Sequence, residues 1–281
     1  MEPVARASGF RERASRPHLP RFALMTTGMV FLALVIVLPM VSMFQYASGH
    51  GFTVFWESIS SPGALFSLRF SITLALATTL INGALGTLVA FMLVRYDFPL
   101  KGLVDSLIDL PVAIPASVTG LTILLLYGPM GILGKVFEGA GITITFAFPA
   151  ILIAHVFMTL PFVVRAVGPV LVEVDAREQE AARILGASQF QVFTSVILPS
   201  IKGGLIAGCV LTFVRSLGEL GATIFVSGNL ALQTQTAPLF IFSEFSKGNI
   251  AAANSMAVLL VIISLVLFTG FNLSTKLKER K

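Results

Sequence analysis

Three charged residues lie within long apolar stretches of the sequence. Arg215 and Glu219 stand four residues apart, which puts both side chains on one face of a helix, and Asp109 lies just before Pro111 and Pro115. A charge inside a bilayer costs about 2.5–3.5 kcal/mol on insertion scales, so such residues usually face a bundle interior or an aqueous cavity. We expect these three residues either to line a translocation path or its gate, or only to hold the bundle together.

Both interpretations stay open on the sequence alone. Arg215 and Glu219 can neutralise each other at this spacing without outside help, which favours a structural ion pair. The prolines after Asp109 free backbone carbonyls and bend the helix, which is tolerated where a segment lines a cavity. Asp109, interpreted as a buried acid, could equally pair with Arg215 across the bundle. Gly218 and Gly221 flank Glu219 and would allow close approach of another helix.

Signatures of enzyme chemistry are missing from the sequence. Cys209 is the single cysteine, and the three histidines (His18, His50 and His155) show no metal-ligand spacing. A phosphate-binding loop needs Gly-x-x-x-x-Gly-Lys-[Ser/Thr], and the nearest approach, Gly134-Lys135, is followed by valine. We therefore predict no catalytic residue, no metal site and no cofactor. His155 lies in an apolar stretch, where a hydrogen-bonded packing role is favoured over a proton relay.

One polar stretch, from Arg165 to Ile201, is much longer than the other connections and is predicted to form two short helices joined by a glycine. Asp175 and Glu178 have the spacing of a capping box, and Gly186 is suited to the left-handed end of the first helix. The second helix is marked by further residues: Ser188 and Gln191 as a second capping box, the apolar Phe190, Phe193 and Ile197, and Pro199 as its boundary with the next span.

This hairpin, residues 172–199, has an apolar face that the chain itself offers little to cover. Without a partner, the hairpin would lie on the bilayer surface as an amphipathic element. The charges on the hairpin are mixed, since Arg177 and Arg183 are offset by Asp175, Glu178 and Glu180. That mixture favours a protein partner over anionic lipid.

The composition assigns the whole chain to a membrane. Of its 281 residues 56% are hydrophobic and only 12% are charged, whereas a soluble domain carries about 25% charged residues. A soluble enzyme is therefore excluded. Six apolar stretches are long enough to span a bilayer as helices: 22–46, 65–94, 102–127, 146–170, 201–226 and 250–273. The fold class is thus an all-α, polytopic membrane protein, and the first stretch is too long for a signal peptide.

The distribution of charge predicts the topology. If both termini are inside, all but four of the 19 Lys and Arg residues, Arg165 and Lys202 among them, face the cytoplasm. The four exceptions are Arg69, Lys135 and Lys247 on the outside and Arg215 within a span. The net charge of +5 is therefore interpreted as topology and not as nucleic-acid binding. The expected organisation is a cytoplasmic tail at 1–21, a transmembrane domain at 22–275 and a second cytoplasmic tail at 276–281.

Part of the hairpin carries a family motif. Glu180-Ala181-Ala182, Gly186 and Val196-Ile197-Leu198-Pro199 resemble the EAA loop of ABC importer permeases, with valine in place of the first isoleucine of the family pattern. The resemblance implies the type I permease fold and a loop that fits a groove on an ATP-binding subunit. By that resemblance, the coupling residues would be Glu180, Ala181, Ala182, Gly186, Leu198 and Pro199. Since this chain has no phosphate-binding loop, the ATPase would be a separate subunit, present in two copies.

A second resemblance indicates the class of substrate. Segments 93–99, 108–111, 160–165, 215–222 and 228–229 resemble the sulfate/thiosulfate importer permeases, while 215–222 and 234–239 also resemble molybdate permeases. Leu220 stands where both groups usually carry an aromatic residue. The resemblance implies import of a tetrahedral oxyanion, with sulfate or thiosulfate preferred and molybdate or tungstate as the alternative. It further implies a prokaryotic inner-membrane location, an extracytoplasmic binding protein, and a second permease chain, identical or different.

Two other function classes make different predictions for this sequence. A secondary transporter driven by an ion gradient would use Asp109 and Glu219 as buried carboxylates, but it leaves the helix–Gly–helix hairpin unexplained. A purely structural membrane anchor predicts no charges within its spans, which argues against that class here.

Overall fold

The structure is a computed structural model that describes residues 21–49 and 51–279. Every regular element among these residues is helical, which confirms the all-α prediction. Five helices of the described chain are long and apolar enough to span a membrane, and a sixth span is obtained if one sharply bent pair is counted together. The predicted tail at 1–21 lies outside the described residues except for Arg21, and the tail predicted at 276–281 begins as helix.

The described residues fall into two compact units, one ending at Tyr46 and the other beginning at Ala47. The first contains α1 (Arg21–Leu32), a π-helical turn η1 (Ala33–Val37) and most of α2 (Leu38–Gly49). These three elements form one apolar run in which no described residue is buried. A helix of this kind satisfies its backbone N–H and C=O groups by its own hydrogen bonds, and its apolar side chains need lipid or other helices around them.

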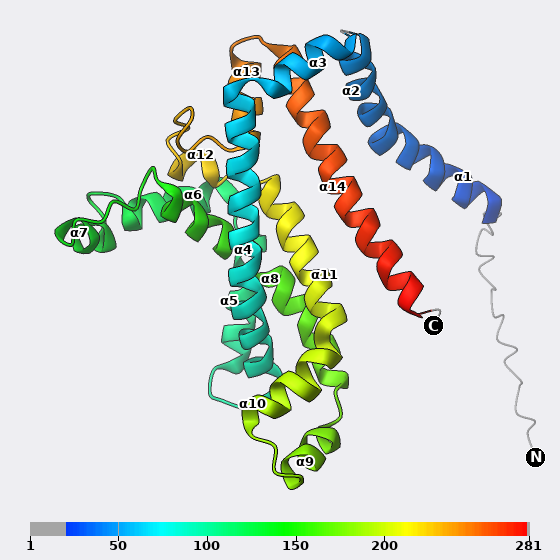
Figure 1. Ribbon diagram of the computed structural model, residues 1–281, viewed down its shortest axis with the longest axis vertical. Helices are drawn as coiled ribbons and strands as arrows, with labels where there is room; N and C mark the ends of the chain where they lie inside the picture. Colours follow the sequence, from blue (N-terminus) through cyan, green and yellow to red (C-terminus); the bar gives the residue numbers. More distant parts are fainter. Residues whose placement is uncertain (1–20, 50, 280–281) are drawn as a thin grey trace, which may run out of the picture. The chain divides into compact units, whose positions relative to one another are not determined.

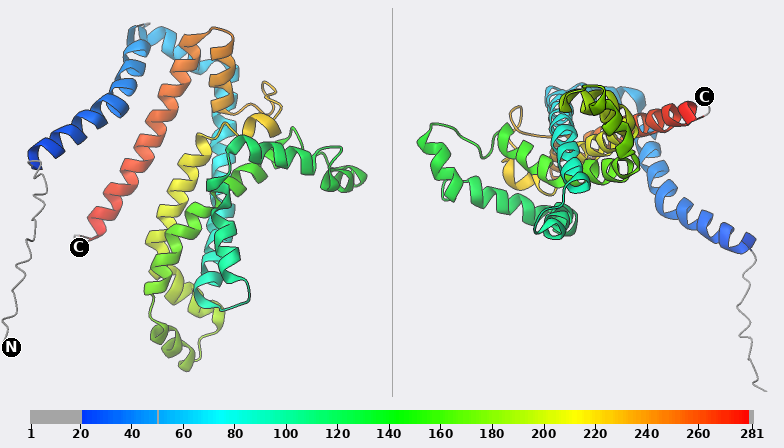
Figure 2. Two further views of the ribbon diagram at one scale, coloured as in Figure 1. Left: turned by 180° about the vertical axis from the view of Figure 1, so that it is seen from behind. Right: turned by 90° about the horizontal axis from the view of Figure 1, so that it is seen from below.

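The second unit is built on three long helices that run side by side, α4 (Pro62–Arg95), α8 (Phe148–Glu173) and α11 (Leu198–Leu217) (Figures 1 and 2). Small residues allow their backbones to approach, as is usual between helices in lipid. A Cβ atom added to Gly86 of α4 would lie 2.7 Å from Val163 of α8, and one added to Gly208 of α11 would lie 2.8 Å from the same residue. The three helices therefore share one close-packed line of contact.

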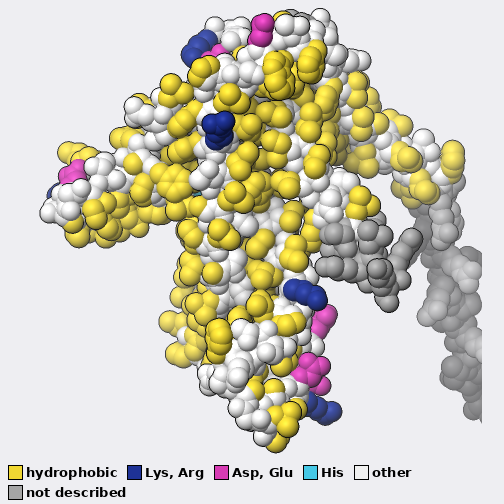
Figure 3. Space-filling model, viewed as in Figure 1, with side chains coloured by type: hydrophobic (Ala, Val, Ile, Leu, Met, Phe, Trp, Pro, Cys, Tyr) yellow, Lys and Arg dark blue, Asp and Glu magenta, His cyan; other side chains and the backbone are white. Residues whose placement is uncertain are grey.

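Shorter helices cap the two ends of this bundle. At one end lie α3 (Gly51–Ser60) and α13 (Ala237–Ser246), from which α14 (Ile250–Glu279) runs back beside α11. At the other end lie α9 (Ala176–Ile184) and α10 (Gln189–Val192) (Figure 1). We call the latter the hairpin end. On the face drawn in Figure 3, hydrophobic side chains cover the long helices, and several charged side chains gather at the hairpin end.

The span predicted at 102–127 is two helices and not one. α5 (Lys101–Ala113) and α6 (Ala116–Tyr127) meet at an angle of 108°, and α6 leads to the short α7 (Ile132–Gly139). Ile114 is extended, with φ −86° and ψ 135°, because the residue before a proline is pushed away from helical geometry. The break therefore falls at Pro115, whereas Pro111 stays inside α5.

The span predicted at 201–226 also differs from the structure at both ends. α11 stops at Leu217, and a non-helical segment leads to the four-residue α12 (Thr223–Val226). At its start, α10, a π-helical turn η2 (Phe193–Ile197) and α11 run on without interruption from 189 to 217, so Pro199 is not the boundary that the sequence suggested. Proline lacks the N–H for a helical hydrogen bond and clashes with the carbonyl four residues back, and we attribute its tolerance to the wider π turn just before it.

The close packing of α11 on α8 gives a test that uses two adjacent glycines. A Cβ at Gly204 would lie 2.5 Å from the carbonyl oxygen of Ala166, whereas one at Gly203 has no atom within 4 Å. Gly204→Ala should therefore destabilise the protein by about 1–3 kcal/mol through overpacking. Gly203→Ala should be neutral or stabilising, because alanine is the better helix former. Thermal unfolding of both variants in the same detergent is the measurement, and equal melting temperatures would contradict the packing.

Candidate functional site

Arg215 and Glu219 lie at the break between α11 and α12. Gly218 ends α11, and Glu219 follows it, so the predicted pair forms across the end of a helix and not within one. The Arg215 Nη1 to Glu219 Oε2 distance is 2.5 Å, and Glu219 Oε1 accepts a hydrogen bond from the Ala222 N–H at 3.0 Å. The Glu219 side chain is only 1% exposed, against 41% for Arg215. A buried carboxylate is very costly without such partners, so the pair fixes the shape of the break.

His155 of α8 lies beside the same break and is buried. Its Nδ1 is 2.7 Å from the Ser216 hydroxyl, at the end of α11, and its Nε2 is 2.9 Å from the Thr223 hydroxyl, at the start of α12. Both ring nitrogens are therefore hydrogen-bonded, which confirms the predicted hydrogen bonding of His155.

A second helix break packs against the first. A Cβ at Gly120 of α6 would lie 2.4 Å from the carbonyl oxygen of Ala222, and one at Gly221 would lie 2.7 Å from the Cβ of Ala116. The start of α6, just after the 108° bend, thus touches the backbone between α11 and α12. This confirms the close approach expected at Gly221. The two irregular segments form one junction inside the bundle.

Asp109 is not the buried acid that the sequence suggested. Its side chain is 53% exposed, and it pairs with Arg165 of α8 at 2.6 Å and not with Arg215. Arg165 also reaches Asp105, one turn earlier on α5, at 2.7 Å. The physical reason is a tertiary contact: Arg165, which lies within the span predicted at 146–170 and within α8, reaches the two carboxylates of α5. We call Asp105, Asp109 and Arg165 the ionic cluster.

The exposure of the ionic cluster limits what can surround it. Arg165 and Asp105 are 44% and 48% exposed, on helices that belong to predicted spans. Half-exposed charges are too costly to face lipid chains. We infer that this side of α5 and α8 faces water or another protein.

The predicted hairpin is present and its caps are mostly as expected. Ser188 and Gln191 form a reciprocal capping box, and Gly186 has φ +88°, so both predictions are confirmed. Asp175 caps α9 by accepting from the Arg177 N–H at 2.9 Å, and within this described segment no return bond from Glu178 completes a box. The first cap is thus an Asp cap alone.

The coupling residues predicted in the hairpin divide between an inner and an outer side. Ala182 and Leu198 pack against buried residues of the bundle, while Glu180, Ala181, Gly186 and Pro199 are exposed. Beside them the tip of the hairpin exposes large apolar side chains, namely Ile184 at 85%, Leu185 at 87% and Phe190 at 75%. An apolar patch set among charges is typical of a protein contact surface.

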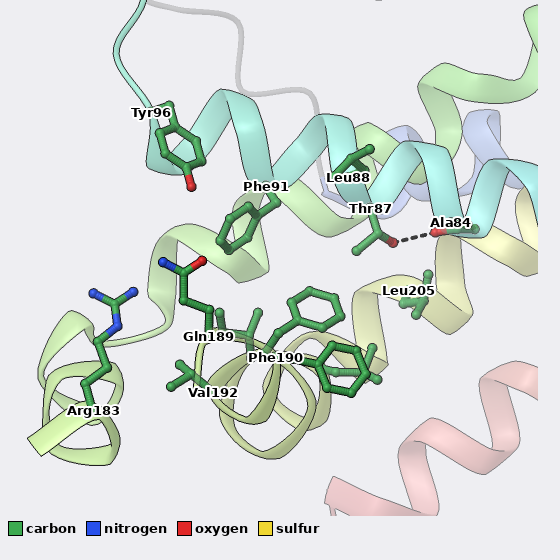
Figure 4. Close-up of a pocket in the computed structure, with 14 residues that line it drawn as sticks. Ala84, Thr87, Leu88, Phe91, Tyr96, Arg183, Gln189, Phe190, Val192 and Leu205 are labelled. Carbon is green, nitrogen blue, oxygen red and sulfur yellow. Dashed lines mark hydrogen bonds between the residues drawn. The ribbon is translucent and has the colours of Figure 1, made fainter. Parts of the chain in front are cut away.

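A groove of about 880 Å³ separates the second arm of the hairpin from α4. Figure 4 shows Tyr96, Arg183 and Gln189 toward one end of it and apolar side chains such as Leu88 and Leu205 toward the other. Phe91 and Phe193 meet edge-to-face near the groove, with ring centroids 6.3 Å apart. The hairpin therefore contacts α4 by aromatic packing beside an open space.

Sequence reasoning missed the ionic cluster as a unit. The sequence prediction did not include Asp105, and it assigned no ion-pair partner to Arg165. The signal was present, since Asp105 and Asp109 are four residues apart and such a like-charge pair on one helix face is unfavourable without a cation. Which helix would supply the cation was not encoded locally.

Comparison with known proteins identifies the class to which this fold and site belong. A family model described as "Binding-protein-dependent transport system inner membrane component" matches residues 82–281, which include the ionic cluster, the junction and the hairpin. The chain belongs to this family, whose members are membrane permease subunits of ABC importers.

Among curated proteins, this chain is similar to sulfate transport permeases. It is 36% identical over 262 residues to the probable sulfate transport system permease protein cysT of Chlorokybus atmophyticus, covering 93% of this chain and 92% of the relative. It is 36% identical over 260 residues to CysT of Escherichia coli (strain K12), covering 92% and 94%. It is 37% identical over 246 residues to CysW of Synechocystis sp. (strain ATCC 27184 / PCC 6803 / Kazusa), covering 88% and 89%.

Solved structures confirm the fold. A chain of a bacterial alginate ABC transporter in complex with an alginate pentasaccharide-bound periplasmic protein superposes with a TM-score of 0.75, covering 90% of this chain and 92% of that one. A chain of an amino acid ABC transporter gives 0.51, covering 84% and 97%. The identities are 16% and 20%, so these likenesses concern the fold alone.

The ionic cluster can be tested by a double-mutant cycle. Arg165→Gln leaves two carboxylates facing each other, while Asp109→Asn leaves Arg165 paired with Asp105. The double variant should be more stable than the sum of the two losses predicts, with a coupling of about 0.5–3 kcal/mol, measured as free energies of unfolding in detergent.

The control cycle uses Lys101→Gln and Asp97→Asn, a pair in which Asp97 is fully exposed and whose effects should add. Additive effects for Arg165 and Asp109 as well would show that the cluster is not a cooperative unit.

Proposed function

We propose that this chain is the membrane-spanning subunit that imports a tetrahedral oxyanion, sulfate or thiosulfate in preference to molybdate or tungstate, by alternating access. Support for the anion comes from the sulfate permeases that resemble the chain over almost its entire length. In a transporter that works by alternating access, the pore need not hold a tight anion site, because a tight site slows release of the anion. Specificity would then rest largely on an extracytoplasmic binding protein.

The observation that carries the proposal is the hairpin at one end of the bundle. It is rigidly capped, turns at a left-handed glycine, and exposes Ile184 and Leu185 almost completely. Such a surface is unstable against water alone and suits a complementary partner. In our proposal the partner is an ATP-binding subunit, with the exposed Glu180, Ala181 and Gly186 at the contact. Ala182 packs behind them against the bundle, and Leu198 and Pro199 join the hairpin to α11.

The proposed assembly has further members. One permease chain supplies one hairpin, so two ATPase subunits imply a second permease chain, identical or different. The half-exposed ionic cluster and Arg215 are then the natural candidates to face that chain or the water-filled path between the two. We place the complex in the inner membrane of a prokaryotic cell, with Asp109, Arg215 and Glu219 along the path or its gate.

The charges argue against an ion-gradient transporter. Such a protein needs carboxylates that are free to bind and release cations or protons. Asp109 is paired with Arg165, and Glu219 is paired with Arg215 and also accepts the Ala222 N–H. Both acids named for that role therefore already have positive partners.

The first test concerns coupling. Glu180→Lys and Gly186→Pro should leave the chain folded in the membrane but abolish transport-linked ATP hydrolysis, the first by reversing a contact charge and the second because proline cannot adopt φ +88°. Glu138→Lys makes the same charge change on α7, away from the hairpin, and serves as control. Hydrolysis is measured in proteoliposomes with partner subunits present, and normal coupling in both hairpin variants would remove the docking hypothesis.

The second test concerns the substrate. The reconstituted complex should take up radioactive sulfate only with ATP and binding protein present, and excess thiosulfate should compete more strongly than molybdate. Stronger competition by molybdate would favour the alternative anion class. Uptake that persists without the ATPase subunits would contradict the ABC mechanism altogether.

A further inference from the structure

His155 lies where it can hold the two sides of the α11–α12 break. Its ring spans the hydroxyl groups of Ser216, in the last turn of α11, and Thr223, the first residue of α12. All three side chains are buried. The segment between the two hydroxyl groups contains Glu219.

The direction of each hydrogen bond follows from the number of protons available. The Thr223 hydroxyl donates to the carbonyl oxygen of Glu219 at 3.1 Å, which uses its one proton. It must therefore accept from His155 Nε2–H at 2.9 Å. A neutral imidazole then has its lone pair on Nδ1, which accepts from the Ser216 hydroxyl at 2.7 Å.

The result is a series of hydrogen bonds in which Ser216 donates to His155, His155 donates to Thr223, and Thr223 donates to the backbone carbonyl of Glu219. Each of these polar atoms is satisfied only while the break keeps its present shape. Losing one such buried bond costs roughly the full desolvation penalty of the group left behind.

The imidazole itself is held on a fixed support. Ala154 and Thr159 of α8 are buried like His155. Asn82 of α4 donates to Thr159 at 2.8 Å and to the Val156 carbonyl at 3.1 Å, just beyond the histidine. Glu219 in turn holds Arg215. The position of the guanidinium thus depends, through the break, on a histidine of another helix.

We propose that His155 is a positioning residue for transport, which holds the α11–α12 break so that Glu219 and Arg215 keep their place during the cycle. This inference rests on the proposed function, in which that pair lies on the path or its gate. The alternative is that His155 only fills space between α8 and α11.

Two substitutions separate these roles. His155→Gln keeps one N–H donor and one oxygen acceptor in a planar amide, so it can reproduce both bonds, whereas His155→Leu keeps similar volume without either bond. Thr223→Val removes the hydroxyl at nearly constant shape and so breaks the same series of hydrogen bonds at Thr223. This variant remains informative if His155→Leu fails to fold.

The first readout is sulfate transported per ATP hydrolysed by the intact complex in proteoliposomes. His155→Leu and Thr223→Val should each lower this ratio about tenfold or more, the effect expected when one buried hydrogen bond is lost, and the double variant should be no worse than His155→Leu. His155→Gln should stay near wild type. A space-filling role would lower activity without changing the ratio, and that result would overturn the proposal.

The second readout does not need transport. Hydrogen–deuterium exchange in the peptide covering 216–224 should speed up in His155→Leu and Thr223→Val, but not in His155→Gln, while exchange in α13 stays unchanged. If the wild-type complex does not transport sulfate, the proposed function fails. Hydrogen–deuterium exchange at 216–224 then still shows whether His155 holds the α11–α12 break. Unchanged exchange at the break, or faster exchange throughout the chain, would contradict it.

Discussion

The placement of charge in a medium that does not solvate it is the constraint from which the rest of this structure follows. Glu219 is almost fully buried, and a carboxylate there is tolerated only because Arg215 and the Ala222 N–H meet it. The N–H is free to do so because α11 has ended and α12 has not begun. The irregular backbone is in turn tolerated because protein surrounds it, namely α6 on one side and His155 on the other. The charge pair and the helix break therefore support each other.

The same constraint links the junction to the surfaces that this chain leaves uncovered. The ionic cluster on α5 and α8 is half exposed, and the hairpin tip is exposed and apolar. It is costly to expose the charged cluster to lipid chains, and it is costly to expose the apolar hairpin tip to water. One chain of this family is thus incomplete in two different ways, and a second permease and an ATP-binding subunit would each cover one of them. α11 connects the hairpin to the junction, since it follows the second arm of the hairpin and ends at the Arg215–Glu219 pair.

Local signals predicted the parts of this protein that depend on local physics. The Ser188–Gln191 capping box and the left-handed Gly186 each follow from a few neighbouring residues, and the structure confirms them. The apolar stretches also predicted where the spans lie, except that 102–127 is two helices and the helix predicted at 201–226 stops at Leu217. The predictions failed where the decisive partner was distant in sequence. A pairing of Asp109 with Arg215 was one open alternative, and no residue near Asp109 indicates that its partner is Arg165, 56 positions away on α8. Likewise, Glu219 was placed inside a span, because the contact of α6 with the α11–α12 break is a tertiary feature.

Docking of the hairpin on a separate ATP-binding subunit can be tested directly by site-specific photo-crosslinking. A photoreactive residue replaces Leu185, which is 87% exposed at the hairpin tip, and a matched one replaces Phe245 of α13, exposed at the opposite end of the bundle. In membranes containing the whole transporter, position 185 should crosslink to the ATP-binding subunit and position 245 should not. Crosslinking of position 185 to lipid alone would contradict the account.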